Sequence, residues 1–525
     1  MSDSRRSHTR FKAIAAELPW LIVASAAATA LLAALPTLNH PWGSNWPMYF
    51  EAARYFWDPS AAYFGWRPPM YPLLLATTGQ AVGYVEAAHG IAQGSMVVVV
   101  FASGWLARMC VGRGGAMLAT LSLPLLQCAV EGAMWTNMYP PAAALFTLSA
   151  AVSVALFRRP GIALALLAGL IAGLAWRLNH LGLVAVPLGL GMATLGARSL
   201  MRLALLPMLF GLGVSGAVAL DGWIVDRWSV PQEGLSDQVI QRRREELDRI
   251  ASGQVERTQY SACTQLEPRP LNIAELTNAC ARQFVEANHG TLRAEDCAPP
   301  LTVLIGLLPL CLLPSARRRD WRDCVASVLL FGGPLGAFLI AAAWTSYAEK
   351  YMISFLGMMV LMAPLAFDRA AGWIGRIFDH VDLGRMLGLV AATAWVVYIW
   401  PGASTLRADS PNIQRDWESV AGEVAEWASS SMEADDLLID CVPLNIDLVI
   451  LPAKANIIEG VSTEADCIAW VASPPPSRGQ TFLVQQSFYG QPHTESDYLM
   501  EKGWLLVRTL DDRHRLWRRP QAASR

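Results

Sequence analysis

Long apolar runs recur along most of the chain, and they constrain its fold more than any other feature. A helix needs about 20 predominantly apolar residues to cross the hydrocarbon core of a bilayer. Enough runs approach this length to predict an α-helical polytopic membrane protein with about eleven transmembrane helices. The runs lie near residues 18–37, 88–107, 114–131, 137–157, 161–176, 180–197, 203–222, 301–315, 325–344, 351–367 and 384–401.

The composition agrees with a membrane protein. Hydrophobic residues make up 54% of the chain and charged residues 16%, whereas about a quarter of the residues in a soluble domain are charged. The formal net charge is −2, and the sequence has no basic cluster interleaved with aromatic residues. It therefore predicts contact with membrane lipids and gives no sign of a nucleic-acid partner.

The basic N-terminal segment MSDSRRSHTRFK precedes the first apolar run. A cleaved signal peptide has a shorter apolar core and a small-residue cleavage site. The run from Leu18 to Pro36 is closer to a full span. We therefore expect a retained first helix.

Arginines in alternate loops predict the orientation, because cytoplasmic loops carry an excess of Lys and Arg. With a cytoplasmic N-terminus every short cytoplasmic loop is basic, and eleven spans place the C-terminus outside. The short outer loops then hold only Arg54, Arg67, Arg177 and Lys350. The arginines of the predicted cytoplasmic loops are Arg108, Arg113, Arg158, Arg159, Arg198, Arg202, Arg317, Arg318, Arg319, Arg322, Arg369, Arg376 and Arg385.

The predicted organisation is a transmembrane domain over residues 1–401 with two substantial outer loops, 38–87 and 223–300, followed by an outer domain over 402–525. This tail has a helical segment, DWESVAGEVAEWASS, and then short apolar runs separated by turn-rich stretches, which predicts a small extracytoplasmic α/β domain. Those runs are DDLLIDCVP, IDLVILP, CIAWVAS, TFLVQQS and GWLLVRTL.

Five of the cysteines fall in the outer regions, where an oxidising compartment permits one disulfide in the second loop and one in the tail. They are Cys263, Cys280, Cys297, Cys441 and Cys467. No Cys/His spacing suits a structural zinc site, so no structural metal site is predicted.

The stretch GWRPPMYPLLLA places Arg67 directly before Pro68 and Pro69, where a polar outer loop returns to the membrane. Together with Pro72, these prolines are expected to prevent a regular helix at this entry and to direct a short apolar segment along or into the interface. The arginine can anchor to lipid headgroups or hold a phosphate with its two-pronged guanidinium. Both interpretations stay open.

Four stretches together resemble the GT-C superfamily of polyprenyl-phosphate-sugar glycosyltransferases. They are NWPMYFEAARYF, RPPMYPLLLA, AGLIAGLAWRLNHLGLVAVPL and YAEKYMISFLGMMVLMAPLA. Within that superfamily the chain is most similar to bacterial relatives of protein mannosyltransferases and aminoarabinose transferases. The resemblance covers roughly residues 15–401.

The resemblance implies a multi-pass protein of the bacterial inner (plasma) membrane that transfers a hexosyl or pentosyl group from a polyprenyl-phosphate donor. The acceptor would be a glycan, a lipid or a protein at the extracytoplasmic face. It implies no organic cofactor and leaves a divalent metal open. The reaction needs a general base for the acceptor hydroxyl and cations for the leaving phosphate.

The base is the weak point of the resemblance. The family's catalytic aspartate corresponds to Asn45, and an asparagine cannot take a proton. Glu51 and Asp58 in the same loop, and Glu131 at the outer end of the third span, are the candidate replacements. A loss of catalysis is the fourth alternative.

The predicted donor-phosphate ligands are Arg67, Lys350 with the following Tyr351, and Arg177. Lys350 takes the arginine position of the family's ERY motif, and Arg177 closes the fifth span on the outer side. The remaining predicted cavity residues are Asn45, Tyr49 and His180.

Two other functions are weighed against sugar transfer. A non-catalytic GT-C-like binding or assembly subunit would account for Asn45. A lipid-linked glycan transporter or flippase would place ionisable residues or broken helices near mid-membrane, often in repeated halves. The predicted spans are nearly free of charge and show no repeat, which favours chemistry at the outer face.

Overall fold

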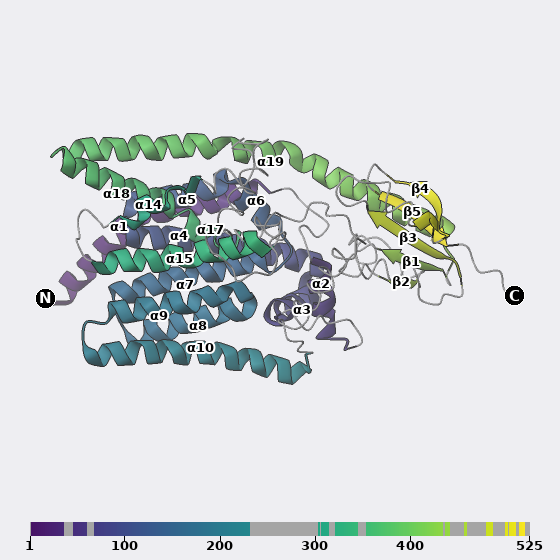
Figure 1. The fold of residues 1–525 in the computed structure, drawn as a ribbon, viewed down its shortest axis with the longest axis horizontal. Helices are drawn as coiled ribbons and strands as arrows, with labels where there is room; N and C mark the ends of the chain where they lie inside the picture. Colours follow the sequence, from purple (N-terminus) through teal and green to yellow (C-terminus); the bar gives the residue numbers. More distant parts are fainter. Residues whose placement is uncertain are drawn as a thin grey trace, which may run out of the picture. The chain divides into compact units, whose positions relative to one another are not determined.

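The computed structural model describes most of the chain and divides it into two units (Figure 1). The helical unit comprises Met1–Thr37, Pro41–Ser44 and Ala52–Ala408, and the sheet unit comprises Leu38–His40, Asn45–Glu51 and Asp409–Arg525. The described residues are 2–35, 46–59, 68–230, 303–304, 306–313, 321–344, 353–433, 436–440, 456–458, 479–486, 499–501, 503–510 and 514–519. The cysteines of the two predicted disulfides lie outside these ranges.

The described part is mostly helical. Its helices are α1 (Ser2–Ala33), α2 (Trp46–Tyr55), α3 (Met70–Val82), α4 (Tyr84–Cys110), α5 (Arg113–Ser122), η1 (Leu123–Leu125), α6 (Gln127–Met134), α7 (Tyr139–Arg158), α8 (Ile162–Leu178), η2 (His180–Val184), α9 (Ala185–Gly196), α10 (Leu200–Trp228), α14 (Leu308–Leu312), α15 (Trp321–Trp344), α17 (Leu356–Met359), α18 (Met362–Ile377) and α19 (Val381–Ser431).

Several of these helices are long and apolar enough to cross a membrane. Within the described residues they are Ala15–Ala33, Tyr84–Cys110, Tyr139–Arg158, Leu200–Trp228 and Val381–Trp400, and a sixth if the bent pair of α5 and α6 is one span. α8 and α9 are shorter apolar helices where runs were predicted. The run near 301–315 is only partly described. A multi-pass membrane protein follows, although the described residues give fewer full-length spans than the eleven runs.

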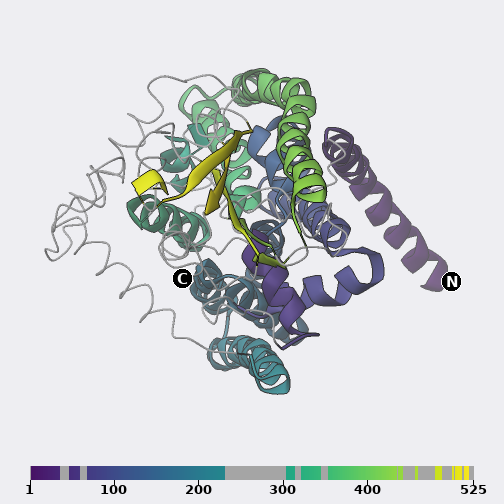
Figure 2. The same cartoon turned by 90° about the vertical axis from the view of Figure 1, so that its right-hand side faces the viewer.

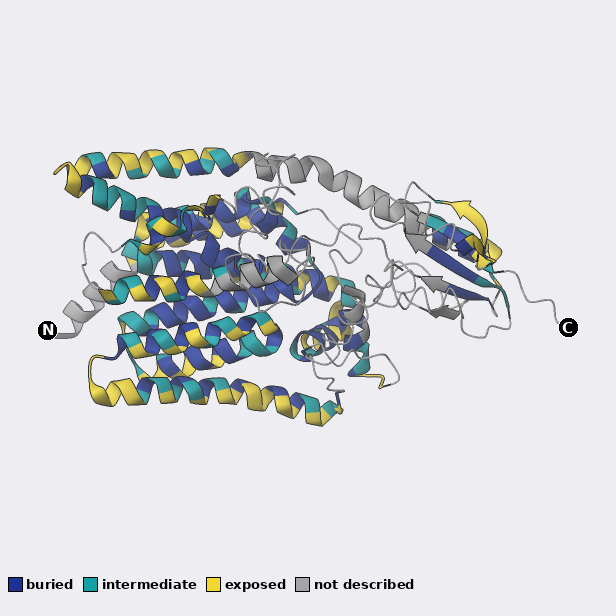
Figure 3. Ribbon diagram, in the orientation of Figure 1, coloured by how far each residue is buried: buried dark blue, intermediate teal, exposed yellow. Residues whose placement is uncertain are grey.

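Burial separates central from peripheral helices (Figure 3). In α7, 78% of the apolar window is buried, against 28% in α10 and 17% in the span of α19. Apolar side chains such as Leu200 and Leu212 are therefore exposed on α10, as suits contact with acyl chains. Figure 2 turns the molecule so that α10 is seen almost end-on.

α8 and α10 pack closely because small residues line their interface. Gly169 and Gly173 lie one turn apart on α8, and a Cβ at Gly173 would lie 2.6 Å from the Cβ of Ala217. Gly213 of α10 likewise packs against the backbone of Leu166, and a Cβ there would overlap it. Such small-residue stripes let transmembrane backbones approach each other.

A single span was predicted near 114–131, but the structure bends it. α5 continues into η1, and α6 leaves at 65° to them. Pro124 lies in η1 and has no N–H to donate to a helical ladder, and Leu126 is extended with φ −86° and ψ 122°. Such breaks at membrane depth persist where protein covers the backbone or where it lines a cavity.

The sheet unit contains a five-stranded mixed sheet in the order β2-β1-β3-β5-β4. β1 is parallel to β2 and β3, whereas β5 is antiparallel to β3 and β4. Its core combines Val424 of α19 with Leu438, Phe482, Val484 and Leu516. The strands are β1 (Leu437–Asp440), β2 (Asn456–Ile458), β3 (Thr481–Gln486), β4 (Leu505–Thr509) and β5 (His514–Arg519).

Three of the strands were expected. β1, β3 and β4 fall in the apolar runs DDLLIDCVP, TFLVQQS and GWLLVRTL. The runs IDLVILP and CIAWVAS lie outside the described residues. β2 and β5 were not predicted.

Candidate active site

The short helix α6 carries the candidate base Glu131. Gln127 lies one turn earlier on the same face, and its Nε2 donates a hydrogen bond of 2.7 Å to Oε1 of Glu131. The Oε1 of Gln127 is buried and has no hydrogen-bond partner in the described structure. The pair therefore combines a held carboxylate with a buried acceptor that a hydroxyl could satisfy.

A buried non-helical segment follows α6 and leads into α7. Thr136 and Asn137 are completely buried. Oδ1 of Asn137 accepts a hydrogen bond of 3.0 Å from the backbone N–H of Tyr139, which begins α7. The ring of Tyr139 meets that of Trp135 edge-on, with centroids 5.9 Å apart. The backbone just after the helix of Glu131 is therefore held in place by the side chains of that same segment.

The loop predicted to be the first outer loop is anchored at the end of α2. The hydroxyl of Tyr55 donates to the carbonyl of Ser229 after α10, at 3.0 Å. Nε1 of Trp57 donates to the carbonyl of Ala76 in α3, at 3.2 Å. Asp58 follows and is exposed. Of the predicted residues nearby, Tyr49 is fully buried, and Glu51 lies on α2 with its side chain outside the description.

A regular helix begins directly after the two prolines that follow Arg67, so the expectation that Pro68, Pro69 and Pro72 prevent one was wrong. Pro72 lies in the first turn of α3, where a backbone N–H has no helical acceptor and its loss costs no hydrogen bond. Pro69 is the residue before α3, with φ −75° and ψ −16°. α3 has 13 residues, which at about 1.5 Å per residue is too short to cross the hydrocarbon core. It ends at Gly83, whose φ of 97° suits a glycine.

Arg177 has a protein partner. Its Nε donates to Oδ2 of Asp221 at 2.8 Å, and its Nη2 binds the same oxygen. Asp221 is 1% exposed and Arg177 is 25% exposed. Arg177 lies one turn beyond Gly173, and Asp221 lies one turn beyond Ala217, so the close packing of α8 and α10 brings the pair together. Its predicted phosphate role is untested, but its charge is already matched.

His180 lies at the start of η2 and is exposed. Oδ1 of the preceding Asn179 accepts a hydrogen bond from the N–H of Leu181 at 3.0 Å. Gly182 fits against the backbone of Ala175, where a Cβ would overlap it. The turn that presents His180 is therefore tightly built.

The other predicted site residues are not placed. Asn45, Arg67, Lys350 and Tyr351 lie outside the described residues. No group of three or more His, Cys, Asp or Glu side chains in the described ranges could hold a metal ion. The absence of a metal stays a prediction.

Sequence reasoning missed two features of this end of the helices. Asp221 was not predicted as a partner of Arg177. It is the single acidic residue in the apolar stretch AVALDGWIV, and that was the only sequence signal for it. Gln127 was not predicted as a site residue, because its contact with Glu131 depends on the bend at Leu126. Pro124 was the only sequence signal for that bend. A large cavity at the other end of the helices was not predicted either, and it does not contain Glu131.

Comparison with known proteins finds similarity in structure and none in sequence. No protein-family model matches the sequence. No curated protein matches it. Among solved structures, ArnT from Cupriavidus metallidurans in the apo state has a TM-score of 0.55 at 13% identity, covering 95% of this chain and 98% of ArnT.

ArnT bound to undecaprenyl phosphate has a TM-score of 0.54 at 12% identity, covering 96% of this chain and 98% of that one. The Archaeoglobus fulgidus oligosaccharyltransferase tethered with an acceptor peptide has a TM-score of 0.50 at 12% identity, covering 94% of this chain and 74% of that one. At these identities the likeness shows a shared fold.

Proposed function

We propose that this chain, which has the GT-C fold, is a membrane glycosyltransferase that moves a sugar from a polyprenyl-phosphate donor to an acceptor. The resemblance to ArnT over nearly the whole of both chains supports a transferase. One of the ArnT structures holds undecaprenyl phosphate, which supports a polyprenyl-phosphate ligand here.

The observation that carries the proposal is the geometry of Glu131. Its carboxylate is half-buried at the end of a broken span and is held by Gln127. In the proposed reaction Glu131 takes the proton of the acceptor hydroxyl. The hydroxyl oxygen bonds to the anomeric carbon of the sugar, and the bond from that carbon to the phosphate oxygen breaks. The polyprenyl phosphate leaves with the bonding electrons.

The leaving phosphate needs positive charge. We assign this role to Arg67 and Lys350, with Tyr351 beside the latter. Arg177 is paired with Asp221, so we assign it an indirect role in fixing the end of α8 before His180. Asn45, Tyr49 and His180 stay predicted cavity residues.

The proposed site lies at the extracytoplasmic face of a bacterial inner membrane. The arginines of several predicted cytoplasmic loops lie together at the opposite end of the helical unit, where they line one cavity. Positive charge of this kind is retained on the cytoplasmic side. We therefore propose that α6 ends outside and that the sheet unit is extracytoplasmic.

The test is sugar transfer by the full chain in liposomes, with radiolabelled polyprenyl-phosphate sugars and glycan, lipid or protein acceptors. Removing a general base costs about 10²- to 10⁴-fold in rate. We expect Glu131→Gln to lose transfer on this scale with unchanged thermal stability. Glu86→Gln, which alters an exposed carboxylate in the first turn of α4, is the matched control and should transfer normally.

Gln127→Leu sharpens the same experiment. It should lower transfer in the native background and have no further effect in the Glu131→Gln background, because the two residues act as one unit. If Glu131→Gln transfers sugar normally and Glu51→Gln or Asp58→Asn does not, the general base is a residue of the first loop and not Glu131.

The second candidate function is a non-catalytic binding or assembly subunit. Asn45, at the position where the family has its aspartate, favours it. Its signature would be binding of polyprenyl phosphate without transfer from any donor. A lipid-linked glycan transporter or flippase is the less favoured alternative, because the predicted spans are nearly free of charge and show no repeat.

A further inference from the structure

A cavity of about 1340 Å³ lies at the arginine-rich end of the helical unit, away from Glu131. It is bounded by residues of α1, α4, α7, α8, α9, α15 and α18 and of the turns between them. We call it the basic cavity. Its volume exceeds that of an ordinary small-molecule pocket, which is about 300 to 1,000 Å³.

The charge of the basic cavity is unbalanced. Among the described residues, six arginines and three carboxylates line it. The arginines are Arg108, Arg158, Arg159, Arg198, Arg322 and Arg369, and the carboxylates are Glu17, Asp323 and Asp368.

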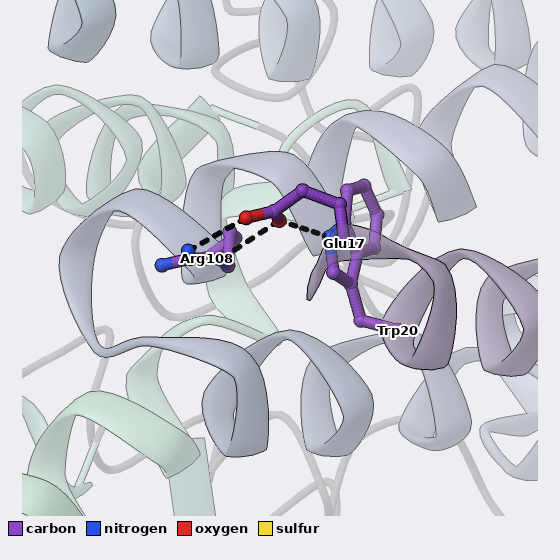
Figure 4. Close-up of polar contacts among 3 residues, drawn as sticks. All are labelled: Glu17, Trp20 and Arg108. Carbon is purple, nitrogen blue, oxygen red and sulfur yellow. Dashed lines mark hydrogen bonds and ion pairs between the residues drawn. The ribbon is translucent and has the colours of Figure 1, made fainter. Parts of the chain in front are cut away.

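One of the carboxylates is fully engaged in joining two helices (Figure 4). Arg108 of α4 donates to both oxygens of Glu17 in α1, from Nε at 2.9 Å and from Nη2 at 2.8 Å. Nε1 of Trp20 donates to Oε2 of Glu17 at 2.6 Å. This cluster is internally neutral, so the excess charge of the basic cavity resides in the other arginines.

Arg369 is buried, with 6% of its surface exposed. It donates to the carbonyls of Cys311 and Leu313 and, at 2.8 Å, to Oγ of Ser327. These acceptors are neutral, so they satisfy its hydrogens without cancelling its charge.

Arg158, Arg159 and Arg198 have no ion pair with any described residue. The Nε of Arg158 is buried and has no hydrogen-bond partner there. A buried donor left unpaired costs free energy, and nearby like charges repel. An anion in the basic cavity would relieve both costs.

Much of the rest of the wall is apolar or aromatic. It includes Leu21, Trp105, Phe157, Met192 and Leu195. A soluble anion would leave these side chains unused, whereas a lipid presents a phosphate to the arginines and hydrocarbon to the wall. Basic pockets between transmembrane helices on the cytoplasmic side bind anionic lipid headgroups in this way.

We infer that the basic cavity binds the phosphate of a lipid, with Arg158, Arg159 and Arg198 as its ligands, at a site separate from that of sugar transfer. The lipid is an anionic phospholipid or a polyprenyl phosphate, since both present the same group. The inference concerns binding alone and does not require that the chain transfer sugar.

The test is native mass spectrometry of the full chain in neutral detergent, with phosphatidylglycerol, undecaprenyl phosphate, phosphatidylcholine or inorganic phosphate added separately. The cavity variant is Arg158→Gln/Arg198→Gln. The matched control is Arg113→Gln/Arg202→Gln, which removes two exposed arginines from the same end but outside the lining. The apo variants should fold as the wild type does, because the replaced arginines have no ion pairs to lose.

We expect the cavity variant to bind at least one of the two anionic lipids about tenfold more weakly than the wild type, and the control to bind as the wild type does. Loss for phosphatidylglycerol identifies a phospholipid, and loss for undecaprenyl phosphate alone identifies the polyprenyl lipid. Equal binding by the cavity variant and the wild type would overturn the inference. So would an equal loss of lipid binding in the control variant, or binding of inorganic phosphate or phosphatidylcholine as tight as that of the two anionic lipids.

The two proposals are separable in the same preparation. Glu131→Gln should bind lipid as the wild type does, since Glu131 is not part of the cavity lining. If the wild type transfers no sugar but the cavity variant binds lipid more weakly than the wild type, only the proposed function is contradicted.

Discussion

At the scale of residues, the pair of Arg177 and Asp221 has the clearest energetic consequence. Removing one partner of a buried ion pair costs about 3 to 5 kcal/mol, because it leaves the other charge uncompensated. The partners differ in exposure, at 25% for Arg177 and 1% for Asp221. Without its partner, the partly exposed Arg177 can still turn its charge toward water or lipid headgroups. The buried carboxylate of Asp221 cannot.

We therefore expect Arg177→Leu to lower thermal stability more than Asp221→Leu does, and the double variant Arg177→Leu/Asp221→Leu to recover most of the loss. Thermal unfolding in detergent measures all three. If Arg177 instead served mainly as a phosphate ligand, Arg177→Leu would keep its stability and lose donor binding, and the double variant would recover nothing.

At the scale of elements, the packing of α8 against α10 depends on glycine. A Cβ at Gly213 would overlap the carbonyl of Leu166, whereas a Cβ at Gly216, one turn away on the same helix, meets nothing within 4 Å. Overpacking costs about 1 to 3 kcal/mol, and an exposed Gly→Ala change in a helix gains about 0.5 to 1 kcal/mol.

We expect Gly213→Ala to unfold at a lower temperature than the wild type, and Gly216→Ala at an equal or higher one. The comparison holds helix propensity constant, so only the contact with α8 differs. Equal melting temperatures for the two variants would mean that the helices can separate without cost and that the Arg177–Asp221 pair does not depend on this packing.

Elements also show where sequence reasoning ends. Apolar runs predicted α4, α7 and α10 well, because in lipid a span must close its own backbone hydrogen bonds. The bend before α6 was missed because Pro124 can lie within a helix or end one, and the surroundings decide. β5 was missed because Arg515, Arg518 and Arg519 dominate its composition.

β5 also breaks the usual alternation of a strand. Leu516 and Trp517 are adjacent and both completely or nearly completely buried, at 0% and 1% exposed. Successive strand residues point to opposite faces, so both faces of β5 are covered. No pattern of period two could have revealed this.

At the scale of the whole molecule, the arginine count predicted which loops share one end, and the lining of the basic cavity agrees for Arg108, Arg158, Arg198, Arg322 and Arg369. Which end faces the cytoplasm remains a prediction. The site is less accessible to such reasoning, because ion pairs and cavities arise between helices that are distant in sequence.

Orientation can be measured with a membrane-impermeant maleimide on intact cells. We expect Glu86→Cys, in the exposed first turn of α4, to be labelled from outside. Ser199→Cys, exposed between α9 and α10, should be labelled only after permeabilisation. Wild-type labelling gives the background from native cysteines. The reverse pattern would place Glu131 in the cytoplasm and remove the basis for outer-face transfer.

The central position of α7 bears on how distant relatives should be compared. Its buried Thr147, Ser149 and Ser153 face other helices, and Thr147 packs against Gly357, so few substitutions fit there. The lipid-facing positions of α10 accept any apolar residue and drift quickly. We therefore expect α7 to accumulate substitutions more slowly than the other helices. Alignments of distant relatives should start from α7, because its sequence should remain recognisable when overall identity is too low to align.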